Sequence, residues 1–211
     1  RVGDRDLTAR VQSSAAALYR EVGEGRRALR LLEEARAAQR DDPKVESETM
    51  ARMAAILQDE GDLAGALTLL QEARSMQLAA GRDVAAARTL SRLAHLQYHR
   101  GELEVAWSQF EEAEQEQLRL KDRRGLTRTR VGLALVYVAE GDHPSAIKVL
   151  EDELVGLKER GLRFHECAVS VHLAATHLHA GDASIGTIYL DRAHDLAMKM
   201  GCQVLMAACR Q

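Results

Sequence analysis

Apolar and small residues recur along this chain at spacings that fit the 3.6-residue period of an α-helix. In the stretch LAHLQYHRGELEVAWSQFEEA, residues 93–113, a Leu-Ala step is followed by a glycine and then by Ala106, Phe110 and Ala113. We predict one helix over about 84–99, capped by Asp83, and a second over about 103–120. Gly101 would supply the left-handed turn between them.

The same pattern occurs five times. The turn glycines are separated by 38, 40, 40 and 40 residues, at Gly23, Gly61, Gly101, Gly141 and Gly181. Small residues lie seven before each glycine (Ala16, Ala54, Ala94, Ala134, Ala174) and five after it (Ala28, Ala66, Ala106, Ala146, Gly186). A bulky residue follows (Leu32, Leu70, Phe110, Leu150, Leu190), then a last small one (Ala35, Ala73, Ala113, Ala193), which repeat four replaces with Glu153. A fixed period of this length indicates an all-α stack of helix pairs that bury their apolar faces against one another.

We therefore predict five antiparallel helix pairs and a partial sixth helix, with the small residues at the contacts between helices. The expected repeats cover about 7–42, 43–81, 82–121, 122–161 and 162–200, and the truncated helix covers 202–211. We expect one repeat domain over 1–211. Because the pattern continues at the C-terminal end, we also expect the chain to be a fragment of a larger protein.

The repeat resembles the tetratricopeptide repeat (TPR) family. The family pattern of leucine, small residue, glycine, alanine, large apolar residue and alanine corresponds in repeat three to Leu93, Ala94, Gly101, Ala106, Phe110 and Ala113. The 40-residue period is similar to the variant repeats of kinesin light chains, of the LGN and Pins adaptors, and of bacterial sensor arrays. The resemblance implies a right-handed α-solenoid that holds a segment of a partner protein in a groove lined by the first helix of each pair.

The groove positions of the family divide this chain into a polar and an apolar half. In repeat three the lining includes Arg88, His95, Tyr98 and His99, whereas repeats four and five contribute Arg128, Val131, Leu135, Val138, Val171 and Leu178. We hypothesise that a partner places an apolar anchor against Val131, Leu135, Val171 and Leu178, and that Arg88 and Arg128 hold its carboxylates. The alternative is that further helices of a longer chain cover this apolar surface.

Two classes of function remain open at this point. The first is an adaptor that binds a peptide segment, and the second is a regulatory array of a larger signalling protein that responds to a peptide or small effector. Self-association through the apolar half is a third alternative. The spindle-orientation adaptors clamp the peptide backbone with an asparagine that this chain replaces with Ala17, Ala55, His95, Leu135 and Ala175.

Composition and charge narrow the classes of partner. The chain has 211 residues, of which 46% are hydrophobic and 29% charged, and its formal net charge is −3. The longest apolar run, 131–139, is too short to span a membrane, so we expect no membrane partner. Arg123, Arg124, Arg128 and Arg130 form one basic cluster, but without aromatic platforms it does not favour nucleic acid. Three cysteines indicate no disulfide framework, and we expect a cytoplasmic setting.

Candidate chemistry is sparse, and we expect neither an enzyme nor a cofactor. His95 and His99 have the spacing of metal ligands on one helical face, but no third ligand lies nearby in the sequence. GDASIG, residues 181–186, has the glycine spacing of a phosphate loop but lacks the lysine that should follow. The carboxylates of Glu111, Glu112, Glu114 and Glu116 are expected on a solvated helix face.

Overall fold

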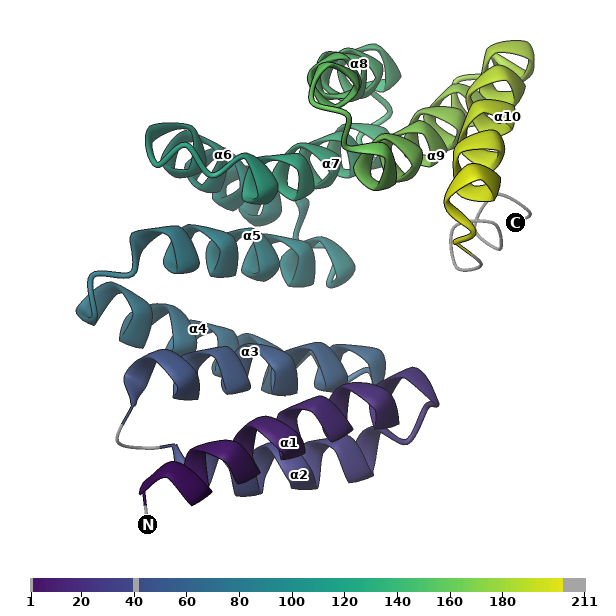
Figure 1. The fold of residues 1–211 in the computed structure, drawn as a ribbon. Helices are drawn as coiled ribbons and strands as arrows, with labels where there is room; N and C mark the ends of the chain where they lie inside the picture. The colour runs from purple at the N-terminus through teal and green to yellow at the C-terminus, as the bar shows by residue number, and fades with distance from the viewer. Residues whose placement is uncertain (1, 40–41, 203–211) are drawn as a thin grey trace. The chain divides into compact units, whose positions relative to one another are not determined.

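The computed structural model describes residues 2–39 and 42–202, except for the side chains at positions 2–7, 9 and 10. Within these ranges the chain forms ten α-helices joined by short turns, and no strand (Figure 1). The helices are α1 (Val2–Glu21), α2 (Gly25–Ala38), α3 (Pro43–Asp59), α4 (Leu63–Ala79), α5 (Asp83–His99), α6 (Leu103–Arg119), α7 (Arg123–Ala139), α8 (His143–Glu159), α9 (Arg163–His179) and α10 (Ala183–Met200). The predicted all-α class of helix pairs is confirmed. The sixth-helix prediction, apart from Cys202, lies outside the described residues.

The chain divides into two compact units. Unit 1 comprises residues 1–109 and 119–121, and unit 2 comprises residues 110–118 and 122–211, so that α6 contributes to both. In unit 1, α1 packs on α2, α2 on α3, α3 on α4 and α4 on α5. In unit 2, α7 packs on α8, α8 on α9 and α9 on α10, and α7 also contacts α9. Within each unit these helices therefore bury a face against their neighbours in sequence, as a stacked repeat requires.

The small positions of the repeat are the core of both units. All the predicted alanines seven before and five after the turn glycines are at most 2% exposed. Leu32, Leu70, Phe110 and Leu150 are also buried, whereas Leu190 is only half-buried. The predicted role of the small residues at helix contacts is confirmed. Phe110 shows how tight this packing is, because a Cβ atom added at Gly132 would overlap the Phe110 ring.

The turns follow the glycine pattern in detail. Gly23, Gly61, Gly101, Gly141 and Gly181 all have positive φ, between 79° and 88°. A second series closes the second helices at Gly81, Gly161 and Gly201, again with positive φ. At the equivalent place in repeat three Lys121 adopts φ 57°, in a region that side chains with a Cβ rarely occupy.

The predicted cap at Asp83 is wrong. Asp83 is the first residue of α5, the N-cap is Arg82, and no side chain accepts a cap hydrogen bond there. Side-chain caps occur instead at other helix starts: Asp62 accepts from the Gly65 amide and Asp142 from the Ser145 amide. The hydrogen bond with Ser145 holds the pKa of Asp142 below its usual value.

Candidate partner-binding surface

The predicted residues on α7 lie along one face of that helix. Arg128, Val131, Leu135 and Val138 are separated by three, four and three residues, a spacing that aligns side chains on a helix. The three apolar side chains are half-buried. Val131 and Val138 also pack against the buried cluster that contains Leu150 and Leu154 of α8. Their exposed surface is therefore smaller than the sequence suggested, because part of it supports the α7–α8 contact.

The predicted residues on α9 belong to the same unit. Val171 is half-buried and packs against the cluster of Cys167, Ala193 and Ala197, between α9 and α10. Leu178 is 51% exposed, and its side chain lies over Gly186 of α10. Since α7 contacts α9, unit 2 holds all the predicted apolar residues on neighbouring first helices. Arg88, His95, Tyr98 and His99 are on α5 and belong to unit 1.

Two arginines on α7, two residues apart, have opposite electrostatic surroundings. Arg130 forms ion pairs through Nε with Glu114 at 2.8 Å and through Nη1 with Glu153 at 3.0 Å. Burial opposes its charge, but these two carboxylates outweigh burial and raise the pKa of Arg130. Within the described part of the chain no acceptor contacts the Arg128 guanidinium, and burial alone lowers its pKa. Arg128 is an exposed residue, but neighbouring protein atoms partly desolvate its guanidinium and lower its pKa, and no acceptor in the described chain compensates its charge.

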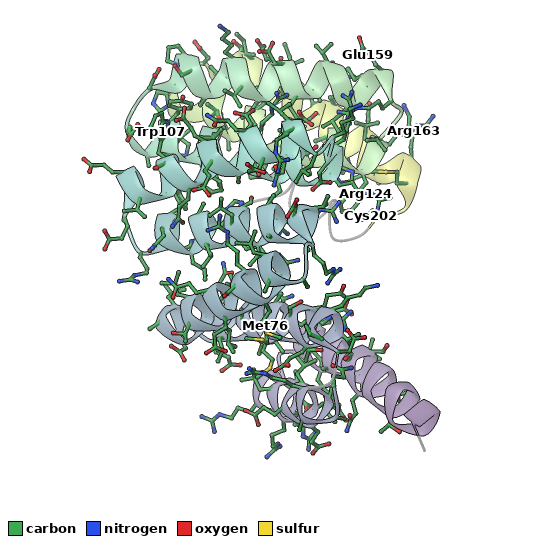
Figure 2. All side chains as sticks on the ribbon, turned by 90° about the vertical axis from the view of Figure 1, so that its left-hand side faces the viewer. Met76, Trp107, Arg124, Glu159, Arg163 and Cys202 are labelled. Carbon is green, nitrogen blue, oxygen red and sulfur yellow. The ribbon has the colours of Figure 1, made fainter. Side chains whose placement is uncertain are left out.

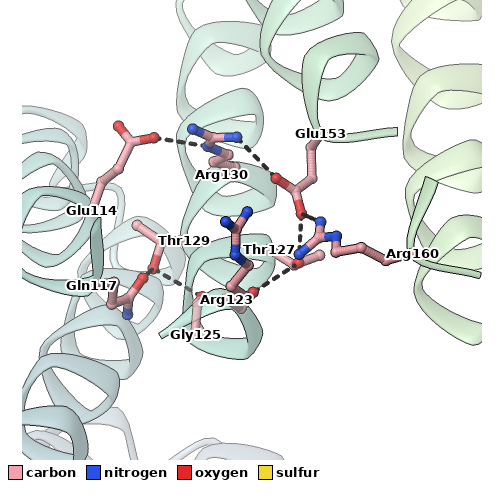
Figure 3. A network of polar contacts seen from close by, with 9 residues as sticks. All are labelled: Glu114, Gln117, Arg123, Gly125, Thr127, Thr129, Arg130, Glu153 and Arg160. Atoms are coloured by element: carbon pink, nitrogen blue, oxygen red, sulfur yellow. Dashed lines mark hydrogen bonds and ion pairs between the residues drawn. The ribbon is translucent and has the colours of Figure 1, made fainter. Parts of the chain in front are cut away.

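Glu153, the residue that breaks the small position of repeat four, is the centre of a buried polar network (Figure 3). Its side chain is 3% exposed and accepts hydrogen bonds from Thr127 at 2.6 Å and from Arg130 at 3.0 Å. It also forms an ion pair with Arg160 at 3.5 Å. Three donors around one carboxylate compensate its burial. The prediction that Glu114 is only solvated is also wrong, because it is half-buried and paired with Arg130.

The predicted basic cluster is divided by these contacts. Arg130 is committed to the network, whereas Arg124, near the start of α7, projects at the same end of unit 2 as Arg163 of α9 and Glu159 of α8 (Figure 2). The acidic Glu159 thus lies at the same end as these two arginines. Because Arg130 is paired within the protein, the cluster offers fewer free charges to a nucleic-acid backbone.

In unit 1, Arg88 lines a pocket of about 580 Å³. Its walls come from α3, the end of α4, the following turn, α5 and Leu120 after α6. They include three further arginines, Arg52, Arg82 and Arg92. His95 and Tyr98 are half-buried and His99 is exposed, and none of the three lines this pocket. The rings of Tyr98 and His99 meet edge to face, with centroids 5.6 Å apart. The structure therefore places Arg88 in a setting different from that of the other predicted α5 residues.

The described histidines include the His95–His99 pair, which has the spacing of metal ligands on one helical face. Among the described residues, no group of three or more His, Cys, Asp or Glu side chains is arranged to hold a metal ion. Burial lowers the pKa of His172 on α9. His177 is buried, stacks on Tyr189 with ring centroids 5.6 Å apart, and has Asp182 3.8 Å from its Nδ1 atom. The contacts of His177 thus lie within the α9–α10 pair rather than at an open site.

Sequence reasoning missed a series of buried polar pairs. The hydroxyls of Thr49, Thr89 and Thr129 donate to the amide oxygens of Gln39, Gln77 and Gln117, each at 2.8 Å. The signal was available, because the glutamines and the threonines follow the same repeat register. At the fourth occurrence the chain has Leu157 and Val169, both buried in one apolar cluster. Both members of the pair change together.

Comparisons with solved structures show what the fold is similar to. The chain matches the TPR-like repeats of a Podosopora anserina putative kinesin light chain with TM-score 0.69 and 19% identity, covering 91% of this chain and 95% of that one. It matches BtubC (BKLC) from P. vanneervenii with TM-score 0.72 and 17% identity, covering 95% and 91%. A Rap protein complexed with competence and sporulation factor matches with TM-score 0.85 and 11% identity. That match covers 97% of this chain but 58% of the Rap chain.

Other comparisons gave no relatives. No protein-family model matches the chain, and no curated protein sequence matches it. Identities of 11–19% to the solved structures show a shared fold and do not by themselves indicate a shared function. None of the described helices is both long enough and apolar enough to cross a membrane.

Proposed function

We propose that this chain, which has the TPR-like fold, is a protein-interaction scaffold. It binds a peptide segment along the face of unit 2 that is formed by α7 and α9, the first helices of their pairs. The observation that carries the proposal is the uncompensated Arg128 guanidinium beside the half-exposed Val131 and Leu135. A partly desolvated cation gains more from a partner carboxylate than a fully hydrated one does. The paired Arg130 lacks this capacity, because it already faces two carboxylates.

The spacing on α7 defines the kind of segment that would fit. Arg128 and Leu135 are seven residues apart, which is about 10 Å along a helix axis. An extended peptide spans that distance with about three residues. We therefore expect a segment with an acidic residue and, about three positions away, a large apolar residue. Val138, Val171 and Leu178 would add apolar contact on either side of the anchor.

The fold likeness supports a peptide as the ligand class. Two of the solved Rap structures are complexes, one with the Phr* peptide and one with competence and sporulation factor. The α5 residues Arg88, His95, Tyr98 and His99 are proposed as a second contact surface, on unit 1. The proposal includes a cytoplasmic setting and no catalysis, although one similar structure is named an aspartyl phosphate phosphatase, of which this chain covers 54%.

A peptide-display selection on the immobilised chain tests the proposal. We expect enriched sequences with the acidic-to-apolar spacing above, and loss of their binding in Leu135→Glu and Val171→Glu. Leu118→Glu, at a 52% exposed site on α6, introduces the same charge on a second helix and should bind normally. Circular-dichroism melts verify that each variant is folded. Equal binding by all three variants would refute a site on this face.

A regulatory array is the second candidate function, and the Rap likeness favours it. In this case peptide binding would shift the balance between two conformations of a longer protein. Hydrogen exchange with and without the selected peptide separates the two candidates. Protection limited to α7 and α9 indicates a passive scaffold, whereas changes in helices far from the peptide indicate a regulatory array.

Sedimentation over a range of concentrations tests self-association through the same face.

A further inference from the structure

The arginine-lined pocket of unit 1 is a separate feature from the face on unit 2. Its volume of about 580 Å³ falls in the range of pockets that hold small ligands. Four arginines line it, Arg52, Arg82, Arg88 and Arg92, against two carboxylates, Glu48 and Asp83. The remaining lining is mostly small or polar and includes the buried Gln77–Thr89 pair. A pocket of this composition suits a charged ligand better than an apolar one.

One wall of the pocket is fixed by contacts between α3 and the start of α5. Arg82 forms an ion pair through Nη2 with Glu48 at 3.0 Å and donates through Nη1 to the Lys44 carbonyl at 3.3 Å. This pair neutralises one of the two lining carboxylates. Arg88 and Arg92 each have at least one interaction within the chain, and a guanidinium with five N–H donors can contact a bound anion in addition. Arg52 adds a further cation from α3.

We propose that this pocket binds a small, doubly charged oxyanion, of the phosphate-monoester or dicarboxylate type. A guanidinium group matches both a planar carboxylate and a tetrahedral phosphate, because two of its N–H groups can donate to two oxygens of the anion. Arginines from α3, from the α4–α5 turn and from α5 would contact one ligand from several sides. The site shares Arg88 with the second contact surface proposed on unit 1, but it does not depend on the peptide face of unit 2. Among its four arginines, Arg88 is the one that the sequence predicted to bind a partner.

Isothermal titration of the whole chain at low ionic strength tests the site, with inorganic phosphate and succinate as the probes. We expect saturable binding of one anion per chain. Arg52→Gln should weaken it about tenfold, equal to about 1.4 kcal/mol. Arg30→Gln, an exposed arginine on α2 outside the pocket, is the matched control and should bind as the unmodified chain does.

The outcomes separate this proposal from the previous one. Binding of phosphate alone or of succinate alone would support the site and identify its ligand class. Absence of saturable binding with both probes would overturn it, as would equal weakening by Arg52→Gln and Arg30→Gln, which would indicate general charge screening. Arg52→Gln should leave capture of the selected peptide by unit 2 unchanged, so either proposal can fail without the other.

Discussion

The two units solve the same packing problem with opposite chemistry at positions two repeats apart. In unit 1 the helix pair α3–α4 buries the apolar Met50 and Ala73, and the next contact, α4–α5, buries the polar pair Gln77 and Thr89. In unit 2 the polarity of the two equivalent contacts is reversed. The pair α7–α8 contains the ionic contact of Arg130 with Glu153, and α8–α9 buries Leu157 and Val169.

This difference teaches that the repeat constrains shape and pairing more than polarity. A buried polar group is tolerated where its partner is present, and it is costly where the partner is removed. Glutamine occurs with threonine and leucine with valine, while Glu153 is accompanied by Thr127, Arg130 and Arg160. A substitution at one member of such a set should therefore cost more than a coordinated change of the whole set.

The largest effect is expected from breaking the ionic set of unit 2. Arg130→Met installs the methionine that unit 1 has at the equivalent position, Met50. It removes an ion pair to the buried Glu153 and should lower the free energy of unfolding by about 3 kcal/mol. The double variant Arg130→Met/Glu153→Ala should lose less than the single one, because no buried carboxylate remains. Urea denaturation measures both. A double variant less stable than Arg130→Met would contradict the paired account.

The reverse exchange applies to unit 1. Thr89→Val removes the hydroxyl that donates to the buried Gln77, and should cost about 1 to 2 kcal/mol. Adding Gln77→Leu reproduces the Leu157–Val169 contact and should recover part of that loss. The same urea experiment measures it, and two losses that simply add would show that the pair is not coupled.

A smaller, stabilising effect is expected at the turn after α6. Lys121 is the one residue other than glycine with positive φ among the described residues, and the equivalent turns have Gly81, Gly161 and Gly201. Lys121→Gly should raise the free energy of unfolding by about 1 kcal/mol, because it relieves a left-handed backbone. The reciprocal Gly161→Lys should lower it by a similar amount. An unchanged melting temperature in both variants would exclude backbone strain at this turn.

The smallest effect concerns pH. Burial holds the pKa of His172 in unit 2 below its unfolded value of about 6.5. Between these two pKa values the unfolded chain binds a proton that the folded chain does not, so stability falls as the pH drops below about 6.5. His172→Gln should therefore lose less stability than the unmodified chain from about pH 7 to about pH 5. His99→Gln, at an exposed site, is the control and should follow the unmodified chain.

Much of the fold followed from spacing alone, because small residues and turn glycines act locally and repeat with the chain. Ala54, Ala94 and Gly101 were placed correctly on that basis. The site was less accessible to prediction. Arg128 and Arg130 look alike in sequence, and they are distinguished only by Glu114 and Glu153, which lie 16 residues before and 23 residues after Arg130 and pair with it. The pocket of unit 1 likewise depends on arginines from separate elements, and its Arg52, Arg82 and Arg92 gave no individual signal.

Arg128 is proposed to hold a carboxylate of the partner segment, and a double-mutant cycle tests this role most directly. The affinity of a selected peptide is measured for the unmodified chain and for Arg128→Gln, with the acidic residue of the peptide intact or changed to its amide. We predict that each single change weakens binding about tenfold and that the second adds little, which gives a coupling energy of about 1.4 kcal/mol. Fully additive losses, or no loss with Arg128→Gln, would contradict the assignment of Arg128.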